Sequence, residues 1–267
     1  MTGTYSSVAQ AEVRISNARA HQYGFVTHTV ESEYQHGETE IRVLLPDKIE
    51  TGKRYPVLYL LPVEAGDGLK WGDAQREAKQ IDLTNKYGVI CVYPTFSHLP
   101  WYVDHPSDPQ IRQETYFLKV VLPFIERNYP ARGERSGRYL LGFSKSGWGA
   151  YSLLLRHPDI FAKSAAWDAP LMLQQGRYGL ETIAGTQSNM EKYRITDLLK
   201  LQANEVSSSK RFVLLGYGNF REPTQQAHEL MNSLKIPHEY ADGPQRKHDW
   251  NTGWVAEAAA LLFPAGH

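Results

Sequence analysis

The stretch that decides the fold is residues 138–150, which read RYLLGFSKSGWGA. An apolar run leads through a tight turn directly into a helical pattern, so we expect a strand, a turn and a helix in succession. Such a turn can hold a strained serine whose hydroxyl stands above the sheet edge, provided that small residues flank it two positions away. Gly142 and Ser146 meet that demand around Ser144. The pattern G-x-S-x-G is imperfect, because Ser146 takes the final glycine position and Gly147 follows it.

This turn favours nucleophilic chemistry at Ser144. A serine at the N-terminus of a helix lies beside free amides and the positive end of the helix dipole, which stabilise developing negative charge. We expect the amide of Lys145 to donate to such an oxyanion. The alternative is that Ser144 only caps the helix, as serines often do.

A histidine stands where a general base is expected. His248 follows the last predicted strand, at 238–241, and precedes the C-terminal helix, which is the order expected for a serine hydrolase of this topology. Its imidazole would take the proton from the serine. The alternative is a solvated loop histidine without a catalytic role.

Strands and helices alternate on both sides of this stretch. We predict strands at 55–61, 89–93, 138–142, 161–167, 211–215 and 238–241, and helices at 73–87, 111–128, 146–156, 223–234 and 254–263. This alternation indicates a parallel sheet. Before it, two segments with alternating polarity, 25–30 and 39–45, predict a hairpin. The expected α/β fold is a mostly parallel central sheet with an N-terminal antiparallel hairpin and helices on both faces.

The composition excludes several classes of protein. The chain has 267 residues, with 29 Lys and Arg against 29 Asp and Glu, and therefore a formal net charge of zero. A neutral chain lacks the electrostatic footprint of a nucleic-acid-binding protein. No stretch approaches the roughly 18 apolar residues that a membrane span needs. The single cysteine, Cys91, is expected to be a buried strand thiol.

We expect one domain over residues 1–267, with a core at about 40–263 and an excursion or substrate lid at 171–204. Residues 1–20 contain no apolar segment after a basic one, which predicts a cytoplasmic location. A secreted chain whose signal has been removed is equally consistent with this sequence. An assembly of identical chains is left open.

Several further segments carry a resemblance to a known family. The chain resembles the putative esterase family of the α/β-hydrolase superfamily, which includes S-formylglutathione hydrolases, feruloyl esterases and mycolyl transferases. The likeness extends over residues 40–260 and rests, besides the serine turn, on segments 56–61, 114–116, 122–126, 155–161, 236–240 and 248–250. The resemblance implies an α/β-hydrolase fold and hydrolysis of a small-molecule carboxylic ester through an acyl-enzyme on Ser144, with His248 as the base and no cofactor.

The acid of the triad departs from the family pattern. The family usually places it after the strand at 211–215, where this chain has Asn219, which carries no charge. Asp168 follows the strand after Ser144 and would lie at the same sheet edge. Glu222 is the alternative acid. Asp168 is the preferred candidate, although a carboxylate there can also simply cap the next turn.

The loop expected to supply the second oxyanion amide departs as well. The family commonly has a His-Gly pair there, whereas residues 61–66 read LPVEAG. The backbone amide of Glu64 can still donate, since any side chain leaves the N–H in place. Its carboxylate would oppose an oxyanion unless it is paired, and Lys145 and Lys70 are the candidate partners.

Aromatic residues are candidates for the substrate walls. Trp71 and Trp101 are expected to line the site, whereas Trp148 is expected in the core. The chain has no spacing typical of a metal site or of a dinucleotide fold. Two alternative functions remain open, an acyltransferase with the same triad and a binding protein on a degenerate hydrolase fold.

Overall fold

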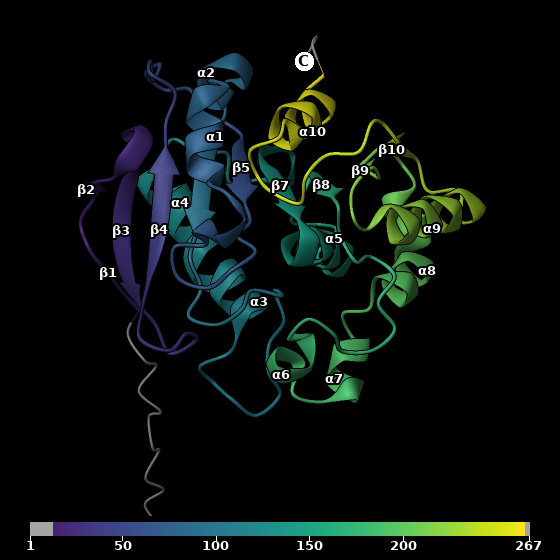
Figure 1. Cartoon of the computed structure of the whole chain (residues 1–267). Coiled ribbons are helices and arrows are strands. Elements are labelled where there is room, and N and C mark those ends of the chain that lie inside the picture. Colours follow the sequence, from purple (N-terminus) through teal and green to yellow (C-terminus); the bar gives the residue numbers. More distant parts are fainter. Residues whose placement is uncertain (1–12, 265–267) are drawn as a thin grey trace, which may run out of the picture.

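A single sheet runs through residues 13–264, the part of the chain that this computed structural model describes (Figure 1). Its strands are β1 (Arg14–Ile15), β2 (Arg19–Ala20), β3 (Val26–Glu31), β4 (Glu38–Leu44), β5 (Val57–Leu60), β6 (Ile90–Pro94), β7 (Arg138–Phe143), β8 (Lys163–Trp167), β9 (Phe212–Leu215) and β10 (His238–Ala241). The order is β1-β3-β4-β6-β5-β7-β8-β9-β10, with β2 also paired to β3.

The strands from β6 to β10 in this order run parallel, whereas β3, β4 and β6 pair antiparallel. The predicted hairpin is confirmed, since Val26 in β3 lies opposite Val43 in β4. The α/β-hydrolase fold is therefore present, with a mostly parallel sheet that begins in an antiparallel hairpin.

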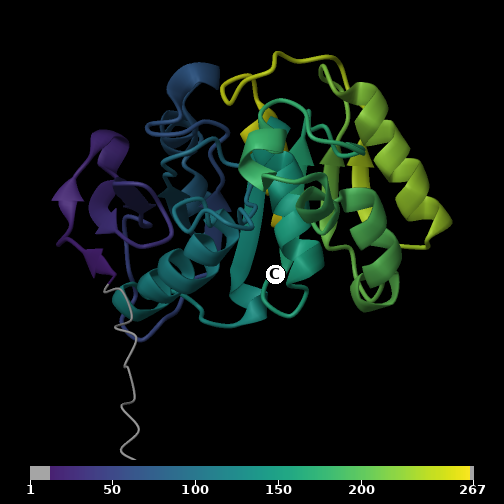
Figure 2. The same ribbon diagram turned by 90° about the horizontal axis from the view of Figure 1, so that it is seen from below.

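Helices cover both faces of the sheet (Figures 1 and 2). They are α1 (Ala74–Gln80), α2 (Leu83–Tyr87), α3 (Gln113–Tyr116), α4 (Leu122–Asn128), α5 (Ser144–Arg156), α6 (Leu180–Ala184), α7 (Gln187–Glu191), α8 (Ile195–Val206), α9 (Arg221–Ser233) and α10 (Trp254–Leu262). Helices α1, α2 and α10 pack on one face, and α3, α4, α5, α8 and α9 pack on the other.

The central strands are buried on both sides, which explains their unbroken apolar sequence. In β5, Val57 and Tyr59 belong to the core under α4 and α5, whereas Leu58 and Leu60 belong to the core under α1 and α10. Alternate side chains of a strand point to opposite faces, so a strand covered twice must be apolar at every position. Cys91 is buried in β6, as predicted.

Two predicted helices differ from the observed ones. The helix expected at 73–87 is broken into α1 and α2, because Asp82 adopts a left-handed conformation with φ 53° between them. The helix expected at 111–128 begins at Gln113, and a π-helical stretch at Phe117–Val121 separates α3 from α4. A left-handed residue in one and a π-helical stretch in the other thus interrupt the 3.6-residue pattern on which the two predictions rest.

The excursion predicted at 171–204 leaves the sheet after β8. It forms the short helices α6 and α7 and then α8, which packs against α5. Asn189 in α7 donates a hydrogen bond of 2.8 Å to the carbonyl of Asp104, so the excursion is tied to the loop after β6. Within residues 13–264, no helix is both long and apolar enough to cross a membrane.

Candidate active site

Ser144 stands at the carboxyl end of β7, on the turn that leads into α5, with a left-handed φ of 50°. A non-glycine residue in this region is strained, and such strain is often found at functional sites. The turn requires Gly142, because a Cβ there would lie 2.4 Å from the carbonyl oxygen of Ser146. The local sequence thus forces the chain through a sharp bend that projects residue 144 from the sheet edge.

The unusual Ser146 stabilises this bend. Its side chain is fully buried, and its hydroxyl donates to the carbonyl of Phe143 at 2.9 Å and accepts from the Phe143 amide at 3.1 Å. The displaced glycine, Gly147, lies where a Cβ would come within 2.8 Å of the Cβ of Ala169. Glycine is therefore needed at 147 for helix α5 to approach the segment after β8.

His248 and Asp168 meet at the same edge of the sheet. Nδ1 of His248 lies 2.6 Å from Oδ2 of Asp168, whose side chain is completely buried. The other carboxylate oxygen, Oδ1, accepts from the Phe220 amide at 2.5 Å. Because a carboxylate only accepts, Nδ1 of His248 carries the proton and Nε2 is left as the basic nitrogen.

One glycine that sequence reasoning missed makes room for the carboxylate. A Cβ on Gly218 would lie 2.2 Å from Cγ of Asp168. The backbone after β9, from Gly218 to Phe220, thus wraps closely around Asp168. No local pattern in the sequence indicated this contact, because Asp168 follows β8 whereas Gly218 follows β9.

The base and the serine turn are in contact through Phe143. The ring of Phe143, the residue before Ser144, packs edge-on against the imidazole of His248 with centroids 5.0 Å apart. Among the described residues, the Ser144 hydroxyl makes no hydrogen bond with His248. Catalytic hydrogen bonds often tighten only when substrate binds, so the missing hydrogen bond does not exclude His248 as the base.

The loop of His248 is held by contacts on both sides. The indole N–H of Trp254 donates to the Lys247 carbonyl at 2.8 Å, and the Arg246 amide donates to the Tyr217 carbonyl at 3.1 Å. These anchors were also missed by sequence reasoning. They fix the loop over the ends of β8 and β9.

The Glu64 carboxylate is paired with Lys145. Nζ of Lys145 lies 2.8 Å from Oε1 of Glu64, and the indole N–H of Trp71 donates to the same oxygen at 2.9 Å. Both charged side chains are largely buried, at 12% and 16% exposure. Lys70 instead lies over the Trp71 ring, so Lys145 is the cation that neutralises Glu64.

The backbone amides of Lys145 and Glu64 are the predicted oxyanion donors. Within residues 13–264, neither the Lys145 nor the Glu64 N–H donates to a main-chain carbonyl. Lys145 lies in the first turn of α5, where helix amides have no intrahelical acceptor. The Glu64 loop is positioned by Tyr102, whose hydroxyl donates to the Pro62 carbonyl at 3.0 Å.

Two aromatic side chains besides Phe143 pack against His248. The ring centroid of Trp71 lies 5.2 Å from that of the imidazole, edge-on, and the centroid of Phe220 lies 5.8 Å from it. Tyr178, from the excursion, is 55% exposed and contacts Phe220 at 5.8 Å. The excursion therefore reaches the rim of the site, and Phe220 and Tyr178 join Trp71 there.

Trp101 does not line the site, in contrast to the prediction. Its side chain is fully buried and packs edge-on against Trp148 at 5.4 Å in the core. Buried Gln113 holds the loop that carries Trp101 inward. Its side-chain oxygen, Oε1, accepts hydrogen bonds from the backbone amides of both Trp101 and Tyr102. Trp148 is buried, as predicted.

The alternative acids lie outside this cluster. Glu222 is exposed on α9, and its carboxylate accepts a hydrogen bond from Gln226 one turn later. Asn219 is exposed on the loop before α9. In the part of the chain that the structure describes, no group of His, Cys, Asp and Glu side chains is arranged to hold a metal ion.

The strand order and the elbow at Ser144 define an α/β-hydrolase fold. The sequence matches the family described as putative esterase over residues 32–257, and the chain belongs to that family. An esterase of Mycobacterium tuberculosis (strain CDC 1551 / Oshkosh) is 34% identical over 140 residues. That stretch is 51% of this chain but only 30% of the length of the relative.

Solved structures share the fold over nearly the whole chain. A ferulic acid esterase aligns with a TM-score of 0.71 at 23% identity, covering 95% of this chain and 97% of its own. An S-formylglutathione hydrolase from Agrobacterium tumefaciens gives 0.71 at 15% identity, covering 93% and 99%. The fluorophosphonate-binding serine hydrolase F of Staphylococcus aureus gives 0.72 at 17% identity, covering 91% and 98%.

Proposed function

We propose that the protein hydrolyses small-molecule carboxylic esters through an acyl-enzyme on Ser144. One observation carries this proposal: the strained Ser144 turn lies at the same sheet edge as the 2.6 Å hydrogen bond between His248 and buried Asp168. An N-cap serine needs neither the left-handed conformation nor a carboxylate-oriented histidine beside it. Membership of the putative esterase family supports the same chemistry.

In the acylation step, Oγ of Ser144 attacks the ester carbonyl carbon. Nε2 of His248 accepts the hydroxyl proton, because Nδ1–H is held by Asp168. The buried carboxylate stabilises the imidazolium that forms. His248 then returns the proton to the leaving alkoxide, which departs as the alcohol.

The amides of Lys145 and Glu64 are the proposed donors to the tetrahedral oxyanion. The pair between Lys145 Nζ and Glu64 Oε1 neutralises the carboxylate that would otherwise repel the oxyanion. The same pair links the two residues whose amides donate, so it ties the Glu64 loop to the first turn of α5.

Water completes the cycle by attacking the acyl-enzyme. His248 takes a proton from this water and returns it to Oγ of Ser144 as the acid product leaves. The aromatic rim of Trp71, Phe220 and Tyr178 supports esters with an apolar or ring-bearing group, because such a group packs on aromatic walls.

Hydrolysis of p-nitrophenyl acetate and butyrate tests the proposal. Turnover by the wild-type protein should fall by about 10³-fold or more in Ser144→Ala, since nucleophile and base act as one unit. Ser152, buried on the same helix, supplies the matched control, and Ser152→Ala should keep the turnover. Wild-type activity in folded Ser144→Ala would exclude Ser144 as the nucleophile.

A further inference from the structure

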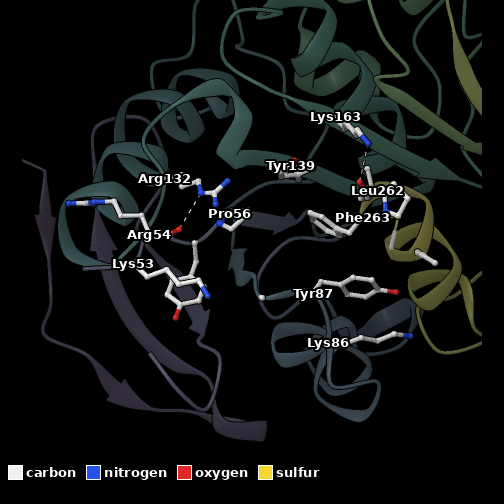
Figure 3. A pocket seen from close by; sticks show the side chains of 14 residues that line it. Lys53, Arg54, Pro56, Lys86, Tyr87, Arg132, Tyr139, Lys163, Leu262 and Phe263 are labelled. Atoms are coloured by element: carbon white, nitrogen blue, oxygen red, sulfur yellow. Dashed lines mark hydrogen bonds between the residues drawn. The ribbon is translucent and has the colours of Figure 1, made fainter. Parts of the chain in front are cut away.

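A cavity opens at the sheet edge opposite Ser144. Its volume is about 930 Å³, and it lies at the amino ends of β5, β7 and β8, below the end of α10 (Figure 3). Its size falls within the range of about 300–1,000 Å³ that is typical of small-molecule sites. Because Ser144 follows the carboxyl end of β7, the whole length of that strand separates the two regions. The cavity is therefore no part of the proposed active site.

Four cations that line this cavity have no carboxylate partner within residues 13–264, namely Arg54, Lys86, Arg132 and Lys163. Figure 3 shows Arg132 on one side of Tyr139 and Lys163 on the other. Nε of Arg132 donates to the Arg54 carbonyl at 3.2 Å, and Nζ of Lys163 donates to the Leu262 carbonyl at 3.2 Å. Within residues 13–264, neither forms an ion pair, and no Asp or Glu lines the cavity.

The pKa of Lys163 indicates that its ammonium group lacks a nearby negative charge. Burial lowers the pKa of its ammonium group. The charge of Glu239, which is paired with Lys210, counteracts this effect only in part. Lys53, another lining residue, differs because Glu50 already neutralises it. Within the described residues, Arg54, Lys86, Arg132 and Lys163 are thus the lining cations without a carboxylate partner, and Lys163 is the one held beside the end of α10 by its hydrogen bond to Leu262.

Aromatic rings form the apolar part of the wall. The ring centroids of Tyr139 and Phe263 are 4.6 Å apart, and those of Tyr87 and Phe263 are 5.5 Å apart. Tyr139 belongs to β7, Tyr87 ends α2 and Phe263 directly follows α10, and all three line the cavity (Figure 3). A flat ring can pack against them while a charged group reaches Arg132 or Lys163.

The geometry points to a binding site for a planar anion, a molecule with a flat apolar ring that bears a carboxylate or phosphate group. The ring packs against Tyr139 and Phe263, and the anionic group pairs with Lys163, which hydrogen-bonds the neighbouring Leu262 carbonyl. Guanidinium and ammonium groups both bind such oxyanions by charge-assisted hydrogen bonds. This site is independent of ester hydrolysis, since none of its residues belongs to the proposed triad.

Calorimetric titration with three naphthalene compounds tests this inference. We expect 2-naphthoate and 1-naphthyl phosphate to bind, and neutral 2-naphthamide to bind at least about tenfold more weakly, because it lacks the charge. The tighter of the two anions identifies the charged group that the site prefers. Equal binding of 2-naphthamide, or no binding of either anion, would overturn the proposal.

Variants locate the site in the cavity. Lys163→Met should weaken anion binding by about tenfold, whereas Lys163→Arg should preserve it, because the charge is retained. Lys200→Met is the matched control, since Lys200 is exposed on α8, on the other side of the molecule from α10. Thermal unfolding of each variant confirms that it is folded. Anion binding that is identical in Lys163→Met and Lys200→Met would place the ligand elsewhere and contradict the inference.

Discussion

Asp168 and His248 are 80 residues apart in the chain, yet their side chains are joined at 2.6 Å with the carboxylate sealed from solvent. The carboxylate has one oxygen for the imidazole and one for the Phe220 amide. This arrangement fixes the ring orientation and leaves Nε2 as the basic nitrogen.

Replacing this carboxylate should reduce turnover strongly. Asp168→Asn removes the charge and allows the wrong imidazole tautomer, so kcat for ester hydrolysis should fall by about 10³- to 10⁴-fold. Glu222→Gln should leave kcat unchanged, because Glu222 contacts only solvent and Gln226. Steady-state kinetics of both variants check this prediction, and a larger loss in Glu222→Gln would move the acid to the first turn of α9.

The ion pair of Glu64 and Lys145 should affect kcat more than KM. Glu64→Ala leaves the Lys145 ammonium and the Trp71 indole without their partner, so the loop that carries the Glu64 amide loses two anchors. Displacement of an oxyanion donor by a fraction of an ångström should lower kcat by about 10- to 100-fold.

Double-variant kinetics distinguish coupling from separate effects of these two residues. Lys145→Met retains its own amide and breaks the same pair, so the double variant should be no slower than Glu64→Ala alone. Losses that simply multiply in the double variant would show that the two side chains act independently.

The close approach of Gly218 to Asp168 predicts a further loss. Gly218→Ala places a Cβ 2.2 Å from the carboxylate carbon, and the carboxylate must therefore shift away from His248. We expect a fall in kcat of about 100-fold with a smaller change in KM. Gly133→Ala is the control, since its Cβ meets only the flexible end of Glu126 at 3.3 Å. Undiminished turnover in Gly218→Ala would show that the position of Asp168 is not critical.

Acid should destabilise the protein partly through Glu114. Burial alone would raise the pKa of this carboxyl, but hydrogen bonds from His157 and Arg156 outweigh burial and lower the pKa. A lowered folded-state pKa stabilises the fold above the unfolded value of about 4.3, and this stabilisation is lost as the pH falls through the folded pKa.

Thermal unfolding of wild type and Glu114→Gln across pH 3–7 measures this contribution. The wild-type protein should have the higher Tm at pH 6–7, and the difference should shrink as the pH falls below about 4. A difference in Tm that stays constant over this range would show that ionisation of Glu114 does not contribute.

The fold was predictable because hydrophobic periodicity reports burial directly. The fully apolar β5 and the alternating β3 and β4 identified the parallel and antiparallel parts of the sheet. The break at Asp82 was not predictable, since nothing in the amphipathic pattern marks an aspartate that adopts the left-handed conformation.

The sequence predicts those candidate site residues that directly follow a strand, because their place in the chain puts them at an edge of the sheet. This logic selected Ser144, Asp168 and His248, which the structure gathers at the carboxyl ends of the strands. The role of Gly218 lies in a contact between distant segments and leaves no local pattern. Trp101 was misassigned because its polar neighbours gave no sign that buried Gln113 holds its loop inward.

Labelling with a fluorophosphonate probe tests the central claim most directly. Intact mass and peptide mapping should find one adduct, on Ser144, and none in Ser144→Ala, because only an activated serine reacts at neutral pH. The Asp168→Asn variant should label far more slowly than the wild-type protein. A folded wild-type protein that takes no label, or takes it on another residue, would contradict the proposed nucleophile and favour a hydrolase fold that binds without catalysis.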